Sequence, residues 1–233
     1  MRTTLRRIED MTPHIRTYWF EPVSRFGYIA GQFVEITIPH DNPDVRGSYR
    51  WFTLSSSPTE PLLGITTRFS EPSSSFKQAF HALKVGTEVN FSEPMGDFVL
   101  PKDQSIPLVF VAGGMGVTPC RSMAKWLQDT GEKRQLEVIL AVNQQEDILY
   151  QDIFRTLGCE PTIVITNPPT KWRGVTGHLT AEKLVELVGN DRLKRMYLSG
   201  PETMVESLTD CLQLLGYDSD QLVGDYFPGY QPI

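Results

Sequence analysis

The stretch Pro107-Leu-Val-Phe-Val-Ala-Gly-Gly-Met-Gly-Val-Thr-Pro119 decides the fold of this 233-residue chain. Its apolar first half is typical of a buried parallel strand, and helical spacing follows at Cys120, Met123, Ala124 and Leu127. The glycines therefore lie on a turn between a strand and a helix, where backbone amides and the helix dipole can hold a pyrophosphate. Gly114 and Gly116 begin a G-x-G-x-x-G pattern, but Pro119 stands where the third glycine belongs. Alone, the pattern also fits a tight turn that needs a positive φ angle.

Beyond this turn, strands alternate with helices to the end of the chain. We expect strands over residues 107–112, 136–142, 162–166 and 195–199, and helices over 148–157, 181–188 and 202–215. The last helix should bury one apolar face, made of Met204, Leu208, Cys211 and Leu215. Such alternation predicts a parallel sheet with helices on both sides, whose ligands bind beyond the carboxyl ends of the strands. The glycine turn and Ser199-Gly-Pro201 both follow such ends.

The first hundred residues have a different sequence pattern. Short β-rich runs at 14–20, 33–38, 51–54, 62–69 and 87–91 are separated by turn clusters, with one helix near 76–83. This spacing predicts an antiparallel barrel or sandwich. We therefore expect two domains, an antiparallel β-barrel over residues 1–102 and an α/β domain with a parallel sheet over residues 103–233.

Composition excludes several classes of function. The formal net charge of −6 argues against a nucleic-acid partner, and the basic cluster Arg2, Arg6, Arg7 and Arg16 is interpreted as a solvated face. No apolar run approaches the roughly 20 residues that a membrane span needs, and the N-terminus lacks the apolar core of a signal peptide. We expect a soluble cytoplasmic protein.

Metal chemistry is not indicated either. Cys120, Cys159 and Cys211 are too scattered for an iron–sulfur cluster; the first and last are expected in the core and Cys159 in a loop. The four histidines show no metal-ligand spacing, and no Gly-x-Ser-x-Gly elbow of a serine hydrolase is present. We expect no metal site.

Four ordered motifs together resemble those of the ferredoxin-NADP reductase superfamily. They are Arg50-Trp-Phe-Thr53, the Gly-Gly-Met-Gly-Val-Thr-Pro turn, Ser199-Gly-Pro-Glu-Thr-Met204 and Asp225-Tyr-Phe-Pro-Gly-Tyr230. The resemblance covers essentially the whole chain. It implies that residues 1–102 bind FAD, and that residues 103–233 bind NAD(P) and end in a tail that contacts the flavin.

The resemblance assigns the flavin to the first domain. Arg50 would bind the flavin phosphate, Phe52 would pack on the ring, and Thr53 would reach flavin N5. The family usually has Tyr where Phe52 stands, so a hydrogen bond to the ribityl chain is lost here. Serines at the start of a helix can hold a pyrophosphate through their hydroxyls and the free backbone N–H groups there, although ordinary helix capping explains such serines equally well. The complete expected flavin set is Arg50, Trp51, Phe52, Thr53, Thr66, Arg68, Ser74, Ser75, Phe76 and Phe227.

The resemblance assigns the nicotinamide nucleotide to the second domain. The expected set is Gly113, Gly114, Gly116, Thr118, Pro119, Asn143, Gly200, Pro201 and Met204. NADP-specific relatives often carry basic residues after the strand that ends before Asn143, and here Asn143-Gln-Gln-Glu-Asp147 has none. NADH is therefore favoured over NADPH. The alternative is that Lys171 and Arg173 reach the 2′-phosphate of NADPH.

The implied reaction is hydride transfer from NADH to a bound flavin, followed by release of electrons to an acceptor. Thr53, Ser199 and Asp225 are the expected catalytic residues; Ser199 stands where many relatives have Cys, and either Phe227 or Tyr230 covers the flavin. We expect FAD in preference to FMN, and a separate acceptor such as an iron–sulfur or haem protein, or a small molecule. The alternatives are an NAD(P)H:flavin reductase that uses free flavin as substrate, and a non-catalytic flavin or nucleotide sensor.

Overall fold

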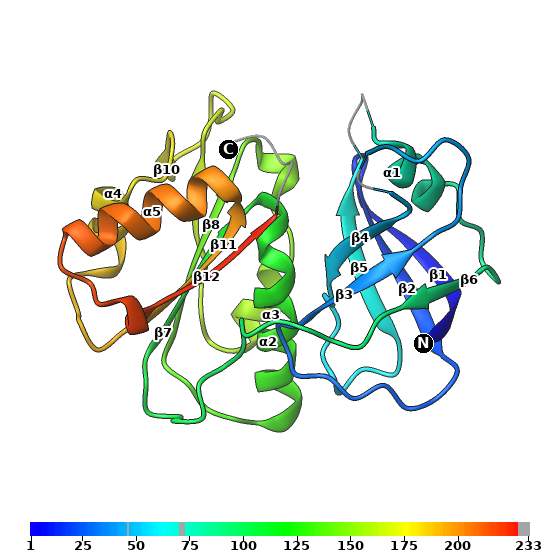
Figure 1. Ribbon diagram of the computed structural model, residues 1–233. Coiled ribbons are helices and arrows are strands. Elements are labelled where there is room, and N and C mark those ends of the chain that lie inside the picture. Colours follow the sequence, from blue (N-terminus) through cyan, green and yellow to red (C-terminus); the bar gives the residue numbers. More distant parts are fainter. Residues whose placement is uncertain (46, 70–72, 228–233) are drawn as a thin grey trace. The chain divides into compact units, whose positions relative to one another are not determined.

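The computed structural model describes residues 1–45, 47–69 and 73–227 (Figure 1). The chain forms two compact units, Met1–Val99 and Leu100–Ile233. The boundary between the units falls slightly earlier than the expected one after residue 102. Each unit has its own sheet and its own core.

The first unit is a six-stranded antiparallel sheet with the order β4-β3-β6-β1-β2-β5. Its strands are β1 Arg2–Thr12, β2 Ile15–Pro22, β3 Phe33–Thr37, β4 Tyr49–Thr53, β5 Leu63–Arg68 and β6 Glu88–Phe91. The edge strands approach each other, because the Ser55 N–H just after β4 donates to the Gly64 carbonyl in β5 at 2.9 Å. The antiparallel fold class expected for the N-terminal half is confirmed.

Helix α1, Ser75–His81, packs on the core of this sheet. Its Phe80 ring meets Tyr18 edge-on at 4.7 Å, and both Phe76 and Phe80 are fully buried. Alternating residues of β3, Val34 and Ile36, point into the same core. The helix thus fixes the end of β4, where Arg50 and Phe52 lie.

Strand β1 was not predicted from the sequence. Thr3 and Leu5 are buried, but Arg6 is an extra residue at a bulge between Leu5 and Arg7, so the alternation of apolar and polar side chains breaks there. Arg2, Arg6 and Arg7 of the basic cluster are exposed and Arg16 is partly buried. All four form ion pairs: Arg2 with Glu88, Arg6 with Glu21, Arg7 with Glu9 and Arg16 with Asp10.

The second unit is a six-stranded parallel sheet with the order β10-β9-β8-β7-β11-β12. Its strands are β7 Leu108–Gly113, β8 Leu136–Val142, β9 Thr162–Ile165, β10 Val175–Thr176, β11 Arg195–Pro201 and β12 Leu222–Phe227. In Figure 1, α2 Val117–Thr130 and α3 Gln151–Thr156 lie on one face of this sheet, and α4 Ala181–Val188 and α5 Glu202–Leu214 lie on the other. The α/β fold class expected for the C-terminal half is confirmed.

The strand order places a topological switch point between β7 and β11. From β7 the chain moves one way to β8 and β9, and it then returns to the opposite side of β7 with β11. In open parallel sheets, ligands bind beyond the carboxyl ends of the strands at such a point. The 3-10 turn η1, Gly114–Gly116, and the end of β11 both lie there.

The expected apolar face of the last helix was wrong. The buried face of α5 consists of Val205, Leu208 and Leu212, whereas Cys211 is only partly buried and Leu215 is 41% exposed just beyond the helix end. Cys159 lies in a loop, as expected, and is buried, because the chain turns inward after α3 and its N–H donates to the Phe154 carbonyl at 3.1 Å. Burial raises the pKa of the Cys159 thiol. Cys120 lies in the core as expected.

Candidate functional site

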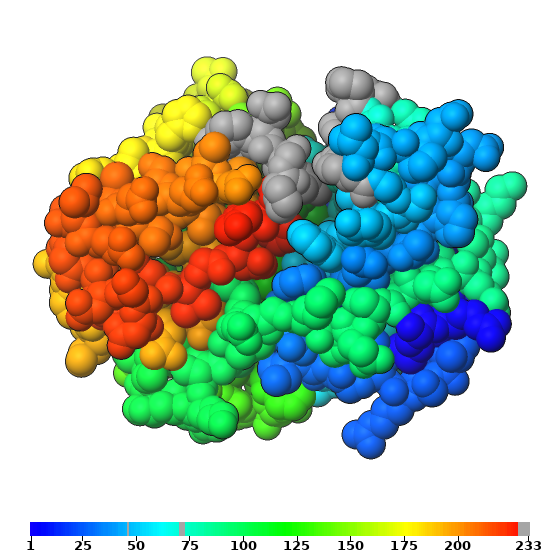
Figure 2. Space-filling view, viewed as in Figure 1, coloured from blue at the N-terminus to red at the C-terminus, as the bar shows by residue number. Residues whose placement is uncertain are grey.

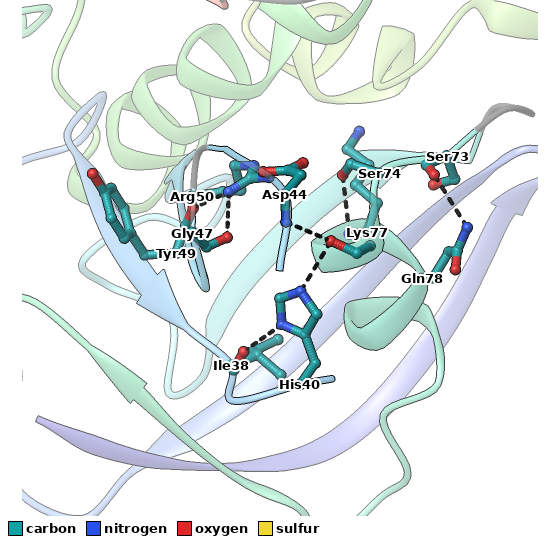
Figure 3. A network of polar contacts seen from close by, with 11 residues as sticks. Ile38, His40, Asp44, Gly47, Tyr49, Arg50, Ser73, Ser74, Lys77 and Gln78 are labelled. Carbon is teal, nitrogen blue, oxygen red and sulfur yellow. Dashed lines mark hydrogen bonds and ion pairs between the residues drawn. The ribbon is translucent and has the colours of Figure 1, made fainter. Parts of the chain in front are cut away.

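Arg50 extends from β4 and is held by the loop that precedes the strand (Figure 3). Its Nη2 donates to both carboxylate oxygens of Asp44, at 2.8 and 2.7 Å, and its Nη1 donates to the carbonyls of Gly47 and Tyr49. The guanidinium carbon also lies 5.1 Å from the centre of the Phe76 ring. Only 14% of the side chain is exposed, so the cation is fixed beside the start of α1.

The same loop is tied to the helix through Ser75. The Ser75 hydroxyl accepts the Asp44 backbone N–H at 3.2 Å and lies 3.1 Å from His40 Nε2. His40 Nδ1 lies 2.8 Å from the Ile38 carbonyl, which can only accept, so Nδ1 is the donor in that contact (Figure 3). These contacts connect Ile38, His40, Asp44 and Arg50 with the first turn of α1.

The expected phosphate-binding serines have partners within the chain. Ser74 is the N-cap of α1, and its hydroxyl accepts the Lys77 N–H at 3.2 Å. Helix capping therefore accounts for Ser74, as the competing explanation proposed. The Phe76 side chain is fully buried in the core, so only the backbone of Phe76 could meet a ligand.

Strand β4 places its aromatic side chains on opposite faces. Phe52 is 8% exposed and stacks on Phe80 at 5.1 Å and on Phe76 at 6.0 Å. Trp51 is 58% exposed, and Thr53 is 5% exposed. The exposed aromatic ring of this motif is thus Trp51, whereas Phe52, the residue expected to pack on a flavin, is part of the core.

Thr66 lies in a buried hydroxyl network. Its Oγ1 is 2.8 Å from Thr17 Oγ1 and 2.9 Å from Ser55 Oγ. These contacts join β2, β5 and the segment after β4, which gives Thr66 a structural role. Arg68 is half-buried at the end of β5, and its carbonyl accepts from Lys77 Nζ at 3.1 Å.

The glycines of the turn after β7 serve the packing of the chain on itself. A Cβ at Gly116 would lie 2.0 Å from the Ser199 carbonyl oxygen, and one at Gly113 would lie 2.6 Å from the Met204 sulfur. Gly114 has φ of +51°, a conformation that favours glycine. The sequence correctly placed the turn between a strand and a helix, but two of its glycines are needed for close contact with the end of β11 and the start of α5.

The next residues open α2. The Thr118 hydroxyl donates to the Met115 carbonyl at 2.9 Å, and Pro119 lies in the first helical turn, where the missing N–H costs nothing. The described residues supply no side-chain cap to this helix. The turn η1 runs directly into this helix, and the Val117 N–H donates to the Gly114 and Met115 carbonyls. An anion would therefore be met by the backbone amides at the start of η1, where no described side chain caps the turn.

Asn143 lies on the surface just beyond β8. Its Oδ1 accepts from Asn167 Nδ2 at 2.6 Å, and its carbonyl accepts the Asn167 N–H at 2.9 Å. The loop after β9 therefore borders the loop after β8. Lys171 and Arg173 follow in that loop and are exposed.

The end of β11 carries a buried hydroxyl. Ser199 is fully buried, and its Oγ finds no hydrogen-bond partner among the described residues. A buried hydroxyl without a partner is costly, and such groups are typical of sites that receive a ligand or water. Gly200 packs against the Gly113 backbone, and Met204 contacts both glycines. The switch-point residues named from the sequence are thus brought together.

Strand β12 runs parallel to β11 and pairs Asp225 with Ser199 and Phe227 with Pro201. Burial raises the pKa of Asp225 to about 6. Burial, and secondarily the negative charge of Asp225, raise the pKa of the Cys120 thiol. Figure 2 shows β12 in red at the surface of the second unit, where Tyr226 is 51% exposed. Tyr230, the other expected flavin cover, lies outside the described residues.

Sequence reasoning missed Asp44, the carboxylate that holds Arg50. The only signal was its place in the turn-rich run between β3 and β4, close in sequence to an arginine already singled out. It also missed Thr17 and Ser55, because a hydroxyl network across three segments has no local sequence pattern.

The described part of the chain has neither a cluster of metal ligands nor a membrane-spanning helix. There, no group of three or more His, Cys, Asp and Glu side chains could hold a metal ion. Among the helices of residues 1–45, 47–69 and 73–227, none is long and apolar enough to cross a bilayer.

Known proteins match both the second unit and the whole chain. Residues 110–210 match the family model of the oxidoreductase NAD-binding domain. Flavohemoprotein A of Dictyostelium discoideum is 27% identical over 95% of this chain and 58% of its own length. The glycine betaine monooxygenase reductase subunit of Chromohalobacter salexigens is 30% identical over 91% of this chain and 60% of its own length. The chain thus spans about three fifths of these relatives.

A solved structure matches nearly all of both chains. The ferredoxin NADP+ reductase from Neisseria gonorrhoeae with bound FAD and NADP has a TM-score of 0.83 and 16% identity, and the match covers 97% of this chain and 98% of that one. At this identity the likeness concerns the fold. The expected resemblance is confirmed at the level of the fold: residues 110–210 match the oxidoreductase NAD-binding domain, and the whole chain has the same two-domain fold as this ferredoxin NADP+ reductase.

Proposed function

We propose that this protein is an FAD-dependent NAD(P)H oxidoreductase that takes hydride from NADH and passes electrons to a separate acceptor. The observation that carries the proposal is the switch point between β7 and β11. It lies within the segment that matches the oxidoreductase NAD-binding domain, and it gathers the glycine turn that leads into α2 and the Ser199 hydroxyl. The antiparallel unit, with its fixed Arg50, would supply the flavin site.

In this proposal the second unit binds the nucleotide mainly through its backbone. The N–H groups at the start of η1 would hold the pyrophosphate, with Gly113, Gly114, Gly116, Thr118 and Pro119 shaping the turn. Gly200, Pro201 and Met204 form the adjoining wall. The Ser199 hydroxyl would hydrogen-bond the nicotinamide amide, which would give this buried group the partner that it lacks within the described chain.

The first unit would bind the flavin along β4. Arg50 would bind the phosphate, exposed Trp51 would pack on the cofactor, and Thr53 would hydrogen-bond near N5. Bound flavin supplies the acceptor for a hydride from nicotinamide C4 and can release electrons one at a time. Thr53, Ser199 and Asp225 would orient the reacting groups; Asp225, with its pKa raised to about 6, would be ionised at pH 7 and would take up a proton only slightly below neutral pH.

NADH is the favoured nucleotide. The loop after β8 presents Asn143, already paired with Asn167, and the acidic Glu146 and Asp147 of η2, Gln145–Asp147. A 2′-phosphate would meet these carboxylates before it meets a cation. Lys171 and Arg173 on the neighbouring loop are the residues through which NADPH would be accepted instead.

The acceptor is proposed to be a protein with a haem or iron–sulfur centre. The printed names of the relatives support this class, since one is the reductase subunit of a monooxygenase and another is a flavohemoprotein. A second candidate function is an NAD(P)H:flavin reductase with exchangeable flavin. It is favoured by one observation, namely that Arg50 is already engaged by Asp44.

Rapid reduction kinetics test the proposed roles. Thr53→Ala is expected to slow flavin reduction by NADH while FAD affinity stays the same, and Thr53→Ser, which keeps the hydroxyl, should retain most of the rate. An unchanged rate in Thr53→Ala would remove Thr53 from the site. If FAD binds but NADH and NADPH fail to reduce it with any artificial acceptor present, the sensor alternative replaces the enzyme.

A further inference from the structure

We propose that Asp44 lowers the affinity of this protein for phosphorylated flavins by competing with the flavin phosphate for Arg50. The inference rests on the proposed function, because it assumes a flavin phosphate at Arg50. It goes further by naming the residue that decides how tightly FMN and FAD are held relative to riboflavin, and therefore whether the flavin is resident or exchangeable.

The geometry makes Asp44 an internal substitute for a phosphate. Both of its carboxylate oxygens accept from Arg50 Nη2, at 2.8 and 2.7 Å (Figure 3). The Nη1 donors of Arg50 are directed at the Gly47 and Tyr49 carbonyls. A phosphate that approaches the outer edge of this guanidinium therefore meets donors already directed at another anion.

The carboxylate is also held in place from its own side. The Asp44 backbone N–H donates to Ser75, whose hydroxyl in turn faces His40, so the residue is anchored at both its backbone and its side chain. The exposed fractions are 14% for the Arg50 side chain and 28% for the Asp44 side chain. Because the pair is screened from bulk water, the competition is stronger than for an ion pair on the open surface.

Two roles for Asp44 predict opposite signs. As a competitor, its negative charge repels the phosphate whether or not the carboxylate swings away, so its removal strengthens binding. As a support that merely orients Arg50, its removal would weaken binding. The direction of the change in phosphate-dependent affinity therefore separates the two roles.

The test compares three flavins and four proteins. Dissociation constants of riboflavin, FMN and FAD are measured by quenching of flavin fluorescence for the wild type, Asp44→Asn, Asp44→Glu and Asp41→Asn. Asp41→Asn makes the same charge change in the same loop, at an exposed residue. We expect Asp44→Asn to bind FMN and FAD about three- to tenfold more tightly and riboflavin unchanged, with both other variants close to the wild type.

Each contrary result has a distinct meaning. If the variant binds FMN more weakly or unchanged while the wild type binds flavins, the competition is refuted and the proposed function stands. Binding of no flavin by any of the proteins would overturn the flavin site and this inference together. Thermal unfolding and riboflavin affinity report whether Asp44→Asn folds; should it not, Asp44→Ser removes the same charge, and the same comparison decides.

Discussion

Gly116→Ala is expected to destabilise the second unit strongly, although alanine fits the backbone there. Gly116 has φ of −60° and ψ of −10°, angles that any residue adopts. The added methyl, however, would lie 2.0 Å from the Ser199 carbonyl oxygen and 2.7 Å from the Gly200 nitrogen, and real Cβ atoms essentially never come within 3.0 Å of other atoms. The turn or the end of β11 must therefore shift by about 1 Å.

The magnitude follows from what has to move. Overpacking costs roughly 1–3 kcal/mol, and the upper end, about 3 kcal/mol, is expected because both neighbours are backbone of a central strand. At Gly113 the clash is mainly with the flexible Met204 side chain, so Gly113→Ala should cost about 1–2 kcal/mol. Met204→Ala should relieve most of that cost in the double variant, whereas it should not rescue Gly116→Ala.

Urea unfolding followed by circular dichroism measures these differences. Gly131→Ala is the matched control in the same unit, since nothing lies within 4 Å of its Cβ position and only its φ of +71° opposes alanine; about 1 kcal/mol is expected. A Gly116→Ala variant within 1 kcal/mol of the wild type would show that the turn and β11 do not pack as described.

Three further predictions concern titration and buried polarity. The pKa of Asp225 is raised by burial from 3.8 to about 6, so the unfolded state ionises first and wild-type stability falls between about pH 4 and 6. Asp225→Asn should remove this fall and be about 3 kcal/mol more stable at pH 7, as seen by unfolding at a series of pH values. The pKa of His81 is lowered from 6.5 to about 3 by burial, and further by Lys77 and Arg16. The unfolded state therefore takes up a proton near pH 6.5 while the folded state stays neutral, so the stability of the protein falls as the pH drops below 6.5. His81→Phe should flatten the thermal unfolding midpoints from pH 6.5 down to pH 4, and an unchanged acid dependence would contradict the burial. Ser199→Ala should leave the free energy of unfolding unchanged or raise it by about 1 kcal/mol, because the lost hydroxyl has no partner within the described chain. A calorimetric titration of the same variant should show weaker NADH binding.

The sequence was most informative where its periodicity was undisturbed. Strand β8 and helix α4 have the predicted bounds, Leu136–Val142 and Ala181–Val188, because continuous apolar runs and helical spacing are direct consequences of burial. Strand β1 escaped prediction because a bulge at Arg6 breaks its alternation. The face of α5 was misplaced because Met204 and Leu208 fit two overlapping apolar stripes, and only the sheet beneath selects the one with Val205 and Leu212.

The candidate site was predictable as a set of loops and less so as a set of contacts. The order of the motifs correctly indicated a nucleotide-binding domain after an antiparallel unit. Which face of β4 holds Phe52 depends on its packing against Phe80, and the partner of Arg50 depends on the path of the loop through Asp44. Such contacts are set by tertiary packing, which no local pattern records.

The central claim is that NADH reduces a flavin held by this chain, and an anaerobic titration tests it most directly. The protein is mixed with FAD, freed of unbound flavin by gel filtration, and titrated with NADH while the flavin absorption band is recorded; NADPH is titrated in parallel. The account predicts that the band bleaches near one equivalent of NADH and much more slowly with NADPH. A protein that retains FAD whose band neither nucleotide bleaches would contradict it.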